Sequence, residues 1–343
     1  MERFEHGGDI YVHAGVLDFS ANLNPCGMPA RVREVLRDNV DAYAVYPDPH
    51  CQALTDALAA YEGVHREWMQ ATAGATDAIV RLVQAARPRR ALLVAPCYSG
   101  YEQALEQVGC QIVWHDLRRE DGFALTKEVL ERIDEGIDLV VLANPNNPTG
   151  RCVDAGLLGT CLEQVRAAGA LVALDECFVE LTERAGSSAL VADNKNLVVI
   201  KAFTKTFALA GLRLGYAICS DAELLARMAA AGQPWAVSVP AQLAGVACLG
   251  EHDHLERSRR LVAAERARLR VSLEECGMAV VPGEANYLLF EGPTGLAEAL
   301  LARGILVRSC DNYRGLSDRW YRVAVRTPQE NDRLMAALQE VCA

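Results

Sequence analysis

Residues 201–216 read KAFTKTFALAGLRLGY, and this stretch decides how we interpret the whole chain. Thr204 and Lys205 precede a turn that contains Gly211, and Arg213 follows Lys205 by eight positions. These are the parts needed to hold a phosphorylated aldehyde cofactor covalently as a Schiff base, with the arginine on a short strand neutralising the phosphate. A solvated loop lysine is the alternative, because most lysines are exposed. The stretch alone leaves both interpretations open.

The composition narrows the class of protein. The chain has 343 residues, of which 51% are hydrophobic, and a net charge of −11 with a sequence pI near 5.2. This length suits a two-domain enzyme or one large α/β domain with an appendage. The acidic balance argues against nucleic acid or anionic membranes as partners. No apolar run is long enough to span a membrane, and the N-terminus MERFEHGGDI lacks the apolar region of a signal peptide.

The twelve cysteines are scattered along the chain, and none forms a C-x-x-C pair. Most of them lie in apolar segments that we expect to be strands or helices. Cysteines in such a pattern are typical of small buried side chains in a reducing compartment. We therefore expect a cytoplasmic protein, without a metal site.

From residue 90 onward, apolar strand patterns alternate with helical patterns. The alternation predicts βαβ units, and therefore an α/β fold with a mainly parallel sheet and helices on both faces. Ligands of such sheets bind beyond the carboxyl ends of the strands. The expected strands are residues 91–95, 111–117, 138–143, 170–176, 197–202 and 213–220, and the helices among them include 78–86, 98–108 and 126–133.

Polar residues stand at the carboxyl ends of these strands. Tyr98 follows the first strand, and Asn147 lies in the loop NPNNPTG after the third. Asp175 ends an otherwise apolar strand, where a carboxylate is costly to bury without a partner. A protonated pyridine nitrogen would be such a partner, and the pair would keep the ring able to accept electrons. The neighbouring Glu176 is expected to face a helix or solvent.

The segment TAGATD, residues 72–77, opens the expected helix at 78–86. Gly74, Ala75 and Thr76 would present free backbone N–H groups and the positive end of the helix dipole, which together form a phosphate cradle. A plain helix cap by Thr76 is the alternative. Both can hold at once, since capping and anion binding use neighbouring donors.

After Trp235 the pattern changes to long helices and short strands, which predicts a smaller α+β domain. The helices are expected at 240–249 and 252–276, and the strands at 279–281, 286–290, 305–309 and 320–326. We therefore divide the chain into an N-terminal arm with part of the small domain (1–40), a large cofactor-binding domain (41–240) and a small C-terminal domain (241–343).

Two arginines of the small domain, Arg308 and Arg322, lie on or beside strands rather than on a charged helix face. Structural salt bridges are one explanation for such residues. A planar guanidinium is also well suited to bind a carboxylate or a phosphate through two hydrogen bonds. Two cationic anchors would indicate a substrate with two anionic groups.

The pattern T-K-x-x-x-L-x-G-L-R-L-G-Y around Lys205 resembles the pyridoxal-phosphate lysine segment of fold type I aminotransferases, and with the motifs on either side the resemblance covers nearly the whole chain. It implies a large domain with a seven-stranded type of sheet, a Schiff base at Lys205, and a homodimer with shared active sites. It further implies roles for other residues. Tyr98 would stack on the ring, Asn147 would donate to its phenolate oxygen, Asp175 would bind its nitrogen, and the phosphate would be held by Gly74, Ala75, Thr76, Thr204, Arg213 and Tyr46 of the other subunit.

The strings HGGDI, LDFSANLNP-x-GMP and RSCDNYRGL…YRVAVR resemble the threonine-phosphate decarboxylase branch of this family. The resemblance implies that His6, Gly7, Gly8 and Asn24 close over the substrate phosphate. It also implies that Arg322 binds the α-carboxylate and that Asn147 and Arg308 contact the substrate. Many aminotransferases of the group carry a tyrosine where this chain has Phe178, and a phenylalanine is expected in the decarboxylase branch.

The implied reaction is decarboxylation of L-threonine O-3-phosphate for cobalamin biosynthesis, with Lys205 as acid and base. Histidinol-phosphate aminotransferases share the fold, the cofactor and a phosphorylated substrate, so transamination is the first alternative. L-serine O-phosphate is an alternative substrate, because one methyl group discriminates by only about 1–3 kcal/mol. A sensor that reuses the fold would lack the lysine, and a dehydrogenase would carry G-x-G-x-x-G after its first strand.

Overall fold

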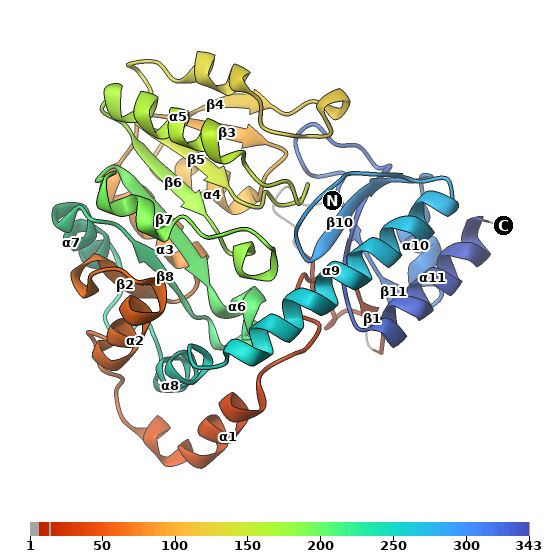
Figure 1. Ribbon diagram of the computed structural model, residues 1–343, viewed down its shortest axis with the longest axis horizontal. Coiled ribbons are helices and arrows are strands. Elements are labelled where there is room, and N and C mark those ends of the chain that lie inside the picture. Colours follow the sequence, from red (N-terminus) through yellow and green to blue (C-terminus); the bar gives the residue numbers. More distant parts are fainter. Residues whose placement is uncertain (1–6, 14, 343) are drawn as a thin grey trace.

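The computed structural model describes residues 7–13 and 15–342. Within them, seven strands form the main sheet in the order β2-β8-β7-β6-β5-β3-β4 (Figure 1). The paired strands run parallel, except that β8 is antiparallel to both of its neighbours. The predicted α/β class with a mainly parallel sheet is therefore confirmed. The strands are β2 (Met69–Thr72), β3 (Arg90–Ala95), β4 (Gln111–Asp116), β5 (Leu139–Ala143), β6 (Leu171–Asp175), β7 (Leu197–Ala202) and β8 (Gly215–Ile218).

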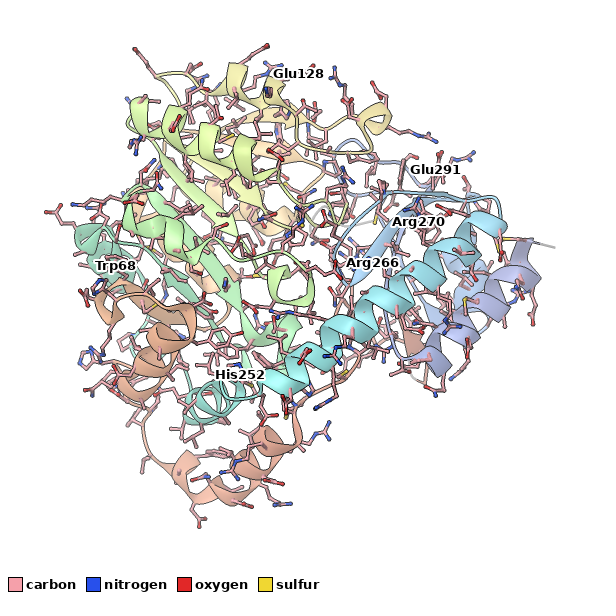
Figure 2. The ribbon with its side chains drawn as sticks, viewed as in Figure 1. Trp68, Glu128, His252, Arg266, Arg270 and Glu291 are labelled. Carbon is pink, nitrogen blue, oxygen red and sulfur yellow. The ribbon has the colours of Figure 1, made fainter. Side chains whose placement is uncertain are left out.

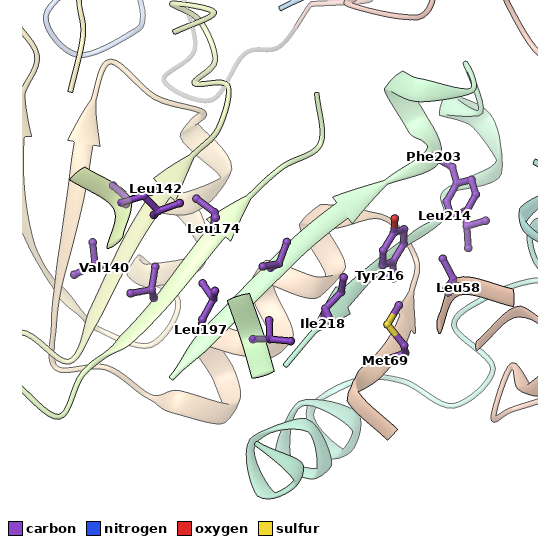
Figure 3. Close-up of a cluster of buried hydrophobic side chains, with 14 of the residues drawn as sticks. Leu58, Met69, Val140, Leu142, Leu174, Leu197, Phe203, Leu214, Tyr216 and Ile218 are labelled. Atoms are coloured by element: carbon purple, nitrogen blue, oxygen red, sulfur yellow. The ribbon is translucent and has the colours of Figure 1, made fainter. Parts of the chain in front are cut away.

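Both faces of this sheet are covered by helices, because successive strand residues point to opposite faces. Leu92 and Leu174 belong to one buried cluster, and Leu93 and Ala173 belong to the other. Figure 3 shows part of the first cluster, where side chains of β5 to β8 extend across the sheet and Leu58 of a covering helix lies near Tyr216 of β8. The first cluster includes residues of α2 (Gln52–Glu62), α5 (Ala155–Ala167) and α8 (Val239–Cys248), and the second includes residues of α3 (Ala75–Ala86), α4 (Ser99–Glu106) and α7 (Ala222–Ala231).

The C-terminal part of the described chain forms a smaller antiparallel sheet, β12-β13-β10-β9, and a parallel pair of β1 with β11. A separate apolar cluster fills the space between these strands and their helices, and Phe19 from the N-terminal segment joins it. The elements are β1 (Leu17–Asp18), β9 (Ala279–Val280), β10 (Tyr287–Glu291), β11 (Ile305–Leu306), β12 (Arg308–Ser309), β13 (Trp320–Ala324), α9 (His252–Glu275), α10 (Leu296–Leu301) and α11 (Pro328–Cys342).

The long helix α9 connects the two parts of the molecule. Its first residue, His252, lies beside the part with the large sheet, and Arg270, towards its other end, lies beside the smaller part (Figure 2). The division into two domains remains a proposal, which the separate apolar clusters support. One segment departs from it: α1 (Ala30–Asp38), assigned above to the arm and small domain, packs on α8, and its Val32 belongs to the large-sheet cluster.

Two local predictions were wrong. The segment expected to be an α-helix at 126–133 is instead a 3-10 helix, η4 (Lys127–Arg132), of the short kind that connects larger elements. The strand expected from 213 begins at Gly215, because Arg213 has a left-handed φ of 57° and ends a turn. The sequence patterns also missed β2, α5, α7, α10 and α11. In the part of the chain that the structure describes, no helix has the length and apolarity of a membrane span.

Candidate active site

A cavity of about 260 Å³ lies at the carboxyl ends of β3, β5, β6 and β7. Parallel strands bring these ends to one edge of the sheet, which is where ligands of such sheets bind. Residues of the N-terminal segment and of the small sheet close the cavity from the other side. Its lining includes Gly7, Ser20, Ala21, Asn22, Ala75, Thr76, Tyr98, Tyr101, Asn147, Asp175, Cys177, Phe178, Thr204, Lys205, Arg213, Tyr313 and Arg322.

Lys205 lies on α6 (Phe203–Thr206), a single helical turn that follows β7 directly. Its Nζ is 5.8 Å from the centre of the Phe178 ring. Burial, followed by the positive charges of Arg322 and Arg213, lowers the pKa of Lys205 to about 8. A lysine in this state is available as a neutral amine near physiological pH, which is the form that attacks a carbonyl or accepts a proton.

Asp175 is 9% exposed at the end of β6, and two hydrogen bonds orient its carboxylate. Tyr101 donates its hydroxyl to Oδ2 at 2.6 Å, and the backbone N–H of Cys177 donates to Oδ1 at 2.9 Å. Burial and the nearby Asp175 carboxylate raise the pKa of Tyr101 well above its ordinary value, so that the tyrosine remains a donor. The arrangement presents a fixed negative group to the cavity.

The N-terminus of α3 forms a narrow cradle beside Arg213. Gly74 caps the helix with a φ of 96°, and a Cβ on it would lie 2.9 Å from Nη2 of Arg213. A Cβ on Gly215 would likewise lie 2.8 Å from the backbone nitrogen of Ala75. Only glycine fits at these two close approaches. The free N–H groups of the first helical turn and the guanidinium of Arg213 therefore converge on one place, as anion sites require.

The ring of Tyr98 stands over the mouth of this cradle. Its hydroxyl is 3.3 Å from Oγ1 of Thr76, and its ring contacts Tyr101 edge-on with centroids 5.4 Å apart. A side chain on Gly100 would overlap the Tyr98 ring, so glycine at that position gives the ring its place. Burial raises the pKa of Tyr98, which keeps its hydroxyl neutral.

Asn147 and Arg322 meet on the opposite wall. Nη1 of Arg322 donates to Oδ1 of Asn147, and Nη2 donates to the backbone oxygen of Ser20 at 2.7 Å. With its oxygen engaged, Asn147 can offer its amide nitrogen to a ligand. Nε of Arg322 is buried and has no hydrogen-bond partner among the described residues. Both hydrogen-bond partners of Arg322, the Asn147 amide and the Ser20 carbonyl, are neutral. An anionic ligand would therefore stabilise its buried charge.

The other predicted anchor, Arg308, lies in a neighbouring cavity of about 410 Å³ and does not line the one around Lys205. It pairs directly with Arg322 across β12 and β13, so both side chains lie on the same face of the small sheet. Arg308 is 5% exposed, donates to Asn312 at 2.8 Å and lies 5.8 Å from the centre of the Tyr313 ring. Tyr313 lines both cavities.

Asn24, in the N-terminal segment, was predicted to contact the substrate, but its side chain is engaged elsewhere. Its amide donates to the backbone oxygen of Thr206 at 2.7 Å and to Oγ of Ser258 at 2.8 Å, and its oxygen accepts from Cys26 at 2.9 Å. Asn24 therefore fastens the N-terminal segment to the lysine turn. Asn22, two residues earlier, lines the cavity instead, and its buried Oδ1 lacks a partner within residues 7–13 and 15–342.

The other N-terminal residues divide in the same way. Gly7 lines the cavity, and the N–H of Gly8 donates to Oγ of Ser20 at 2.7 Å without lining it. His6 lies outside the described residues. Tyr46 is 80% exposed, packs on Trp235 with ring centroids 4.9 Å apart, and does not line the cavity of its own chain.

Glu176 was expected to face a helix or solvent, and the structure excludes solvent. It is 1% exposed and accepts from the N–H and hydroxyl of Ser187, at 2.9 and 2.7 Å, and from Asn144 at 3.3 Å. Burial raises its pKa. The alternation of β6 sends Asp175 and Glu176 to opposite faces of the sheet, and both faces are covered.

Several cavity residues were missed from the sequence, namely Ser20, Asn22, Tyr101 and Tyr313. For Tyr101 a signal existed, because it lies three residues after Tyr98 at the start of α4 and so on the same helical face. Asn22 and Asn24 are both polar residues of one turn-rich segment, and the fold shows that Asn22 is the one that faces the cavity.

Comparison with known proteins agrees with this geometry. Residues 14–338 match the family model named aminotransferase class I and II. The chain is 38% identical to a threonine-phosphate decarboxylase from Salmonella typhimurium, over 98% of this chain and 96% of that protein. It is 29% identical to an adenosylcobalamin biosynthesis bifunctional protein from Leptospira interrogans, over 99% of this chain and 41% of that one. The solved histidinol-phosphate aminotransferase from Clostridium acetobutylicum matches with a TM-score of 0.89 and 27% identity, over 95% of this chain and 99% of that one.

Proposed function

The chain belongs to the class I and II aminotransferase family, and from this premise we propose that it is a pyridoxal-phosphate-dependent threonine-phosphate decarboxylase. The reaction converts L-threonine O-3-phosphate to (R)-1-amino-2-propanol O-2-phosphate and CO2 for cobalamin biosynthesis. The observation that carries the proposal is the 38% identity to a threonine-phosphate decarboxylase over 98% of the chain. Phe178, the residue expected in that branch, lies in the cavity wall beside Lys205.

The residues of the cavity fit pyridoxal phosphate. The cradle of Gly74, Ala75 and Arg213 would take its phosphate, with Thr204 beside Lys205. Asp175 would hold the ring nitrogen, and Lys205 would bind the aldehyde carbon. When bound, the cofactor supplies an electron sink for a carbanion at Cα of the substrate.

The protein's own part in the reaction is to hold the substrate and to move protons. Arg322, whose buried Nε has no partner among the described residues, would bind the α-carboxylate, and Asn147 would keep its guanidinium in place. The amine of Lys205, with a pKa of about 8, would carry a proton between its Nζ and Cα of the substrate. Tyr98 would cover one face of the ring, and the N-terminal segment would exclude water.

The paired arginines support a substrate with two anions. Like charges directly opposite on neighbouring strands are destabilising, and both guanidinium groups are buried, at 5% and 6% exposure. In the proposed complex, the substrate carboxylate would pair with Arg322 and the phosphate would lie on the side of Arg308. Because Tyr313 lines both cavities, we expect the Tyr313 ring to move, or its hydroxyl to share the phosphate, when the substrate binds.

A homodimer belongs to the proposal. Tyr46 has no role in the cavity of its own chain, and it forms an exposed apolar surface with Val45 and Trp235, which are 65% and 48% exposed. A second copy would cover this surface and receive Tyr46 at its cofactor phosphate. Sedimentation of the purified protein tests this point, and a monomer at micromolar concentration would contradict it.

The test of function is incubation with L-threonine O-3-phosphate, with and without 2-oxoglutarate, while CO2 and the amine product are measured. We expect CO2 in the absence of the keto acid. Glutamate formed from histidinol phosphate, without CO2, would instead identify a histidinol-phosphate aminotransferase, which the TM-score of 0.89 to such an enzyme keeps as the second candidate. L-serine O-phosphate, run in parallel, measures how strongly the site selects the methyl group.

A further inference from the structure

A buried lysine lies four residues before Lys205, on the preceding strand. Lys201 is 3% exposed, and its Nζ donates to the two carboxylate oxygens of Glu62 at 3.0 and 2.9 Å and to Oε1 of Glu180 at 3.3 Å. Tyr216 donates to Oε1 of Glu62 at 2.5 Å. Arg259 of α9 donates to Oε2 of Glu180 at 2.9 Å. We call Glu62, Glu180, Lys201, Tyr216 and Arg259 the Lys201 network.

The charges of the network are balanced. It holds two carboxylates, Glu62 and Glu180, and two cations, Lys201 and Arg259. Burial alone would lower the pKa of Lys201, but the carboxylates of Glu62, Glu180 and the nearby Glu176 outweigh it and raise the pKa. The lysine therefore keeps its proton, and it takes no part in the proton transfer proposed for Lys205.

The members of the network lie next to the three loops of the candidate site. Glu180, on the short helix η5 (Val179–Leu181), follows the buried aspartate of β6 by five residues. Lys201 precedes the lysine that would bind the cofactor by four residues. Tyr216 follows the arginine of the phosphate cradle by three residues and pairs with Lys201 across β7 and β8. Each loop thus leaves the sheet within a few residues of the network.

The network also reaches the small part of the molecule. Nε of Arg259 donates to the backbone oxygen of Glu180 at 2.7 Å, so α9 holds the loop as well as the side chain. The preceding residue, Ser258, accepts from Asn24, and the backbone N–H of Asn24 donates to the oxygen of Lys205 at 3.0 Å. The first half of α9, which Figure 2 shows beginning at His252, is therefore fastened to the lysine turn from two sides.

Stability alone does not explain why these groups are charged. A buried ionic cluster costs desolvation, and apolar residues of the same volume often give equal or greater stability. The surroundings could have supplied such packing, because Phe203 and Leu58 lie beside Tyr216 in Figure 3. Ionic hydrogen bonds differ from apolar packing in being directional. Each bond restricts the distance and the angle between the two elements that it joins to a narrow range.

We propose that the Lys201 network is a positioning device, which sets the relative placement of the loops that carry Asp175, Lys205 and Arg213. None of its five side chains lines the cavity around Lys205, so they would act through the backbone on either side of them. This inference depends on the proposed cofactor at Lys205, but it does not depend on which substrate the enzyme takes.

The test is a titration of the full-length apo-protein with pyridoxal 5′-phosphate, followed by visible absorbance at a series of pH values. The variants are Tyr216→Phe, which removes one hydrogen bond and no charge, and Glu180→Gln, which removes one charge. We expect each to bind the cofactor at least about fivefold more weakly, the lower end of usual coupling between sites. We also expect the pH midpoint of the absorbance to shift, because the geometry around Lys205 changes.

The matched control is Val165→Ala, a fully buried truncation on α5 that belongs to the same apolar cluster and touches no member of the network. Urea midpoints of the apo-proteins measure its structural cost and that of the variants. If the variants lose stability while affinity and pH midpoint stay at the values of Val165→Ala, the network is only structural and the proposal is wrong. If the wild type gives no absorbance that depends on Lys205, the proposed function fails and this inference fails with it.

Discussion

Lys201 and Lys205 are both lysines and lie four positions apart, yet their environments shift their pKa values in opposite directions. Lys201 lies among carboxylates that outweigh its burial, and its pKa is raised. Lys205 lies close to Arg322 and Arg213, and burial with these charges lowers its pKa to about 8. One lysine holds strands and helices together as a fixed cation. The other keeps a poorly stabilised charge that it can give up.

The difference shows which region of the protein is built to bind a ligand. Around Lys201 the charged groups form ion pairs with one another. Around Lys205, Nε of Arg322 and Oδ1 of Asn22 have no hydrogen-bond partners among the described residues. Groups of the second kind are costly in the free protein and become useful when a ligand pairs with them. Four experiments test this contrast between the two regions.

The largest effect is expected from Lys205→Ala. The variant loses the amine that we propose to bind the cofactor and move the proton, so decarboxylation should fall by about 10³-fold or more. CO2 release from L-threonine O-3-phosphate measures the loss. Lys195→Ala, which changes an exposed lysine of the preceding loop, should retain wild-type activity. Activity within tenfold of wild type in Lys205→Ala would remove Lys205 from the proposed mechanism.

Lys201→Met should act on stability. It leaves Glu62 and Glu180 buried without their lysine, which costs about 3–5 kcal/mol for a broken buried pair. Urea unfolding of the apo-protein measures this cost. Lys205→Met, made in parallel, should lose far less, because it removes a charge that the fold stabilises poorly. Equal losses in the two variants would contradict the contrast between the two lysines.

The two asparagines of the N-terminal segment also differ in this way, since Asn24 has hydrogen-bond partners within the fold and Oδ1 of Asn22 has none in the described chain. The expected effects are smaller. Asn24→Ala leaves the oxygen of Thr206 and the hydroxyl of Ser258 without their donor, so we expect a loss of about 1–3 kcal/mol in stability. Asn22→Ala removes an acceptor that has no partner in the described chain, so it should change KM for the phosphorylated substrate with little effect on urea unfolding. The opposite assignment of effects would restore Asn24 as the substrate contact.

The smallest effect is a dependence on pH. Between pH 8 and 10.5 the unfolded chain binds a proton at Lys205 that the folded apo-protein does not, so this group makes stability rise with pH. Relative to Lys205→Met, the wild type should gain about 1 kcal/mol over this window, after allowance for screening. Lys201, with its raised pKa, keeps its stabilising proton throughout and loses it only above that window. Urea unfolding at three pH values tests the predicted direction of the pH dependence for each lysine.

The sequence patterns predicted the large sheet and the residues at its carboxyl edge, because both depend on local periodicity and on loops that follow strands. Asp175 and Tyr98 follow directly from this rule, whereas the role of Lys205 was inferred from the resemblance of its segment to a known family. Which of Asn22 and Asn24 faces the cavity depends on contacts with distant residues such as Thr206 and Ser258, and so does the placement of Arg308 in a neighbouring cavity. The Lys201 network was not predictable either, since Glu62 and Lys201 are 139 residues apart and meet only after the sheet has formed.

The arginine pair on β12 and β13 has a consequence for turnover. In the proposed reaction, the substrate carboxylate would pair with Arg322, whose buried Nε has no hydrogen-bond partner among the described residues. Loss of CO2 would then remove this counter-charge, so the affinity for the product would fall when the reaction is complete. The buried charge of Arg322 would in this way favour product release. Rising salt should slow substrate capture more than it slows product departure.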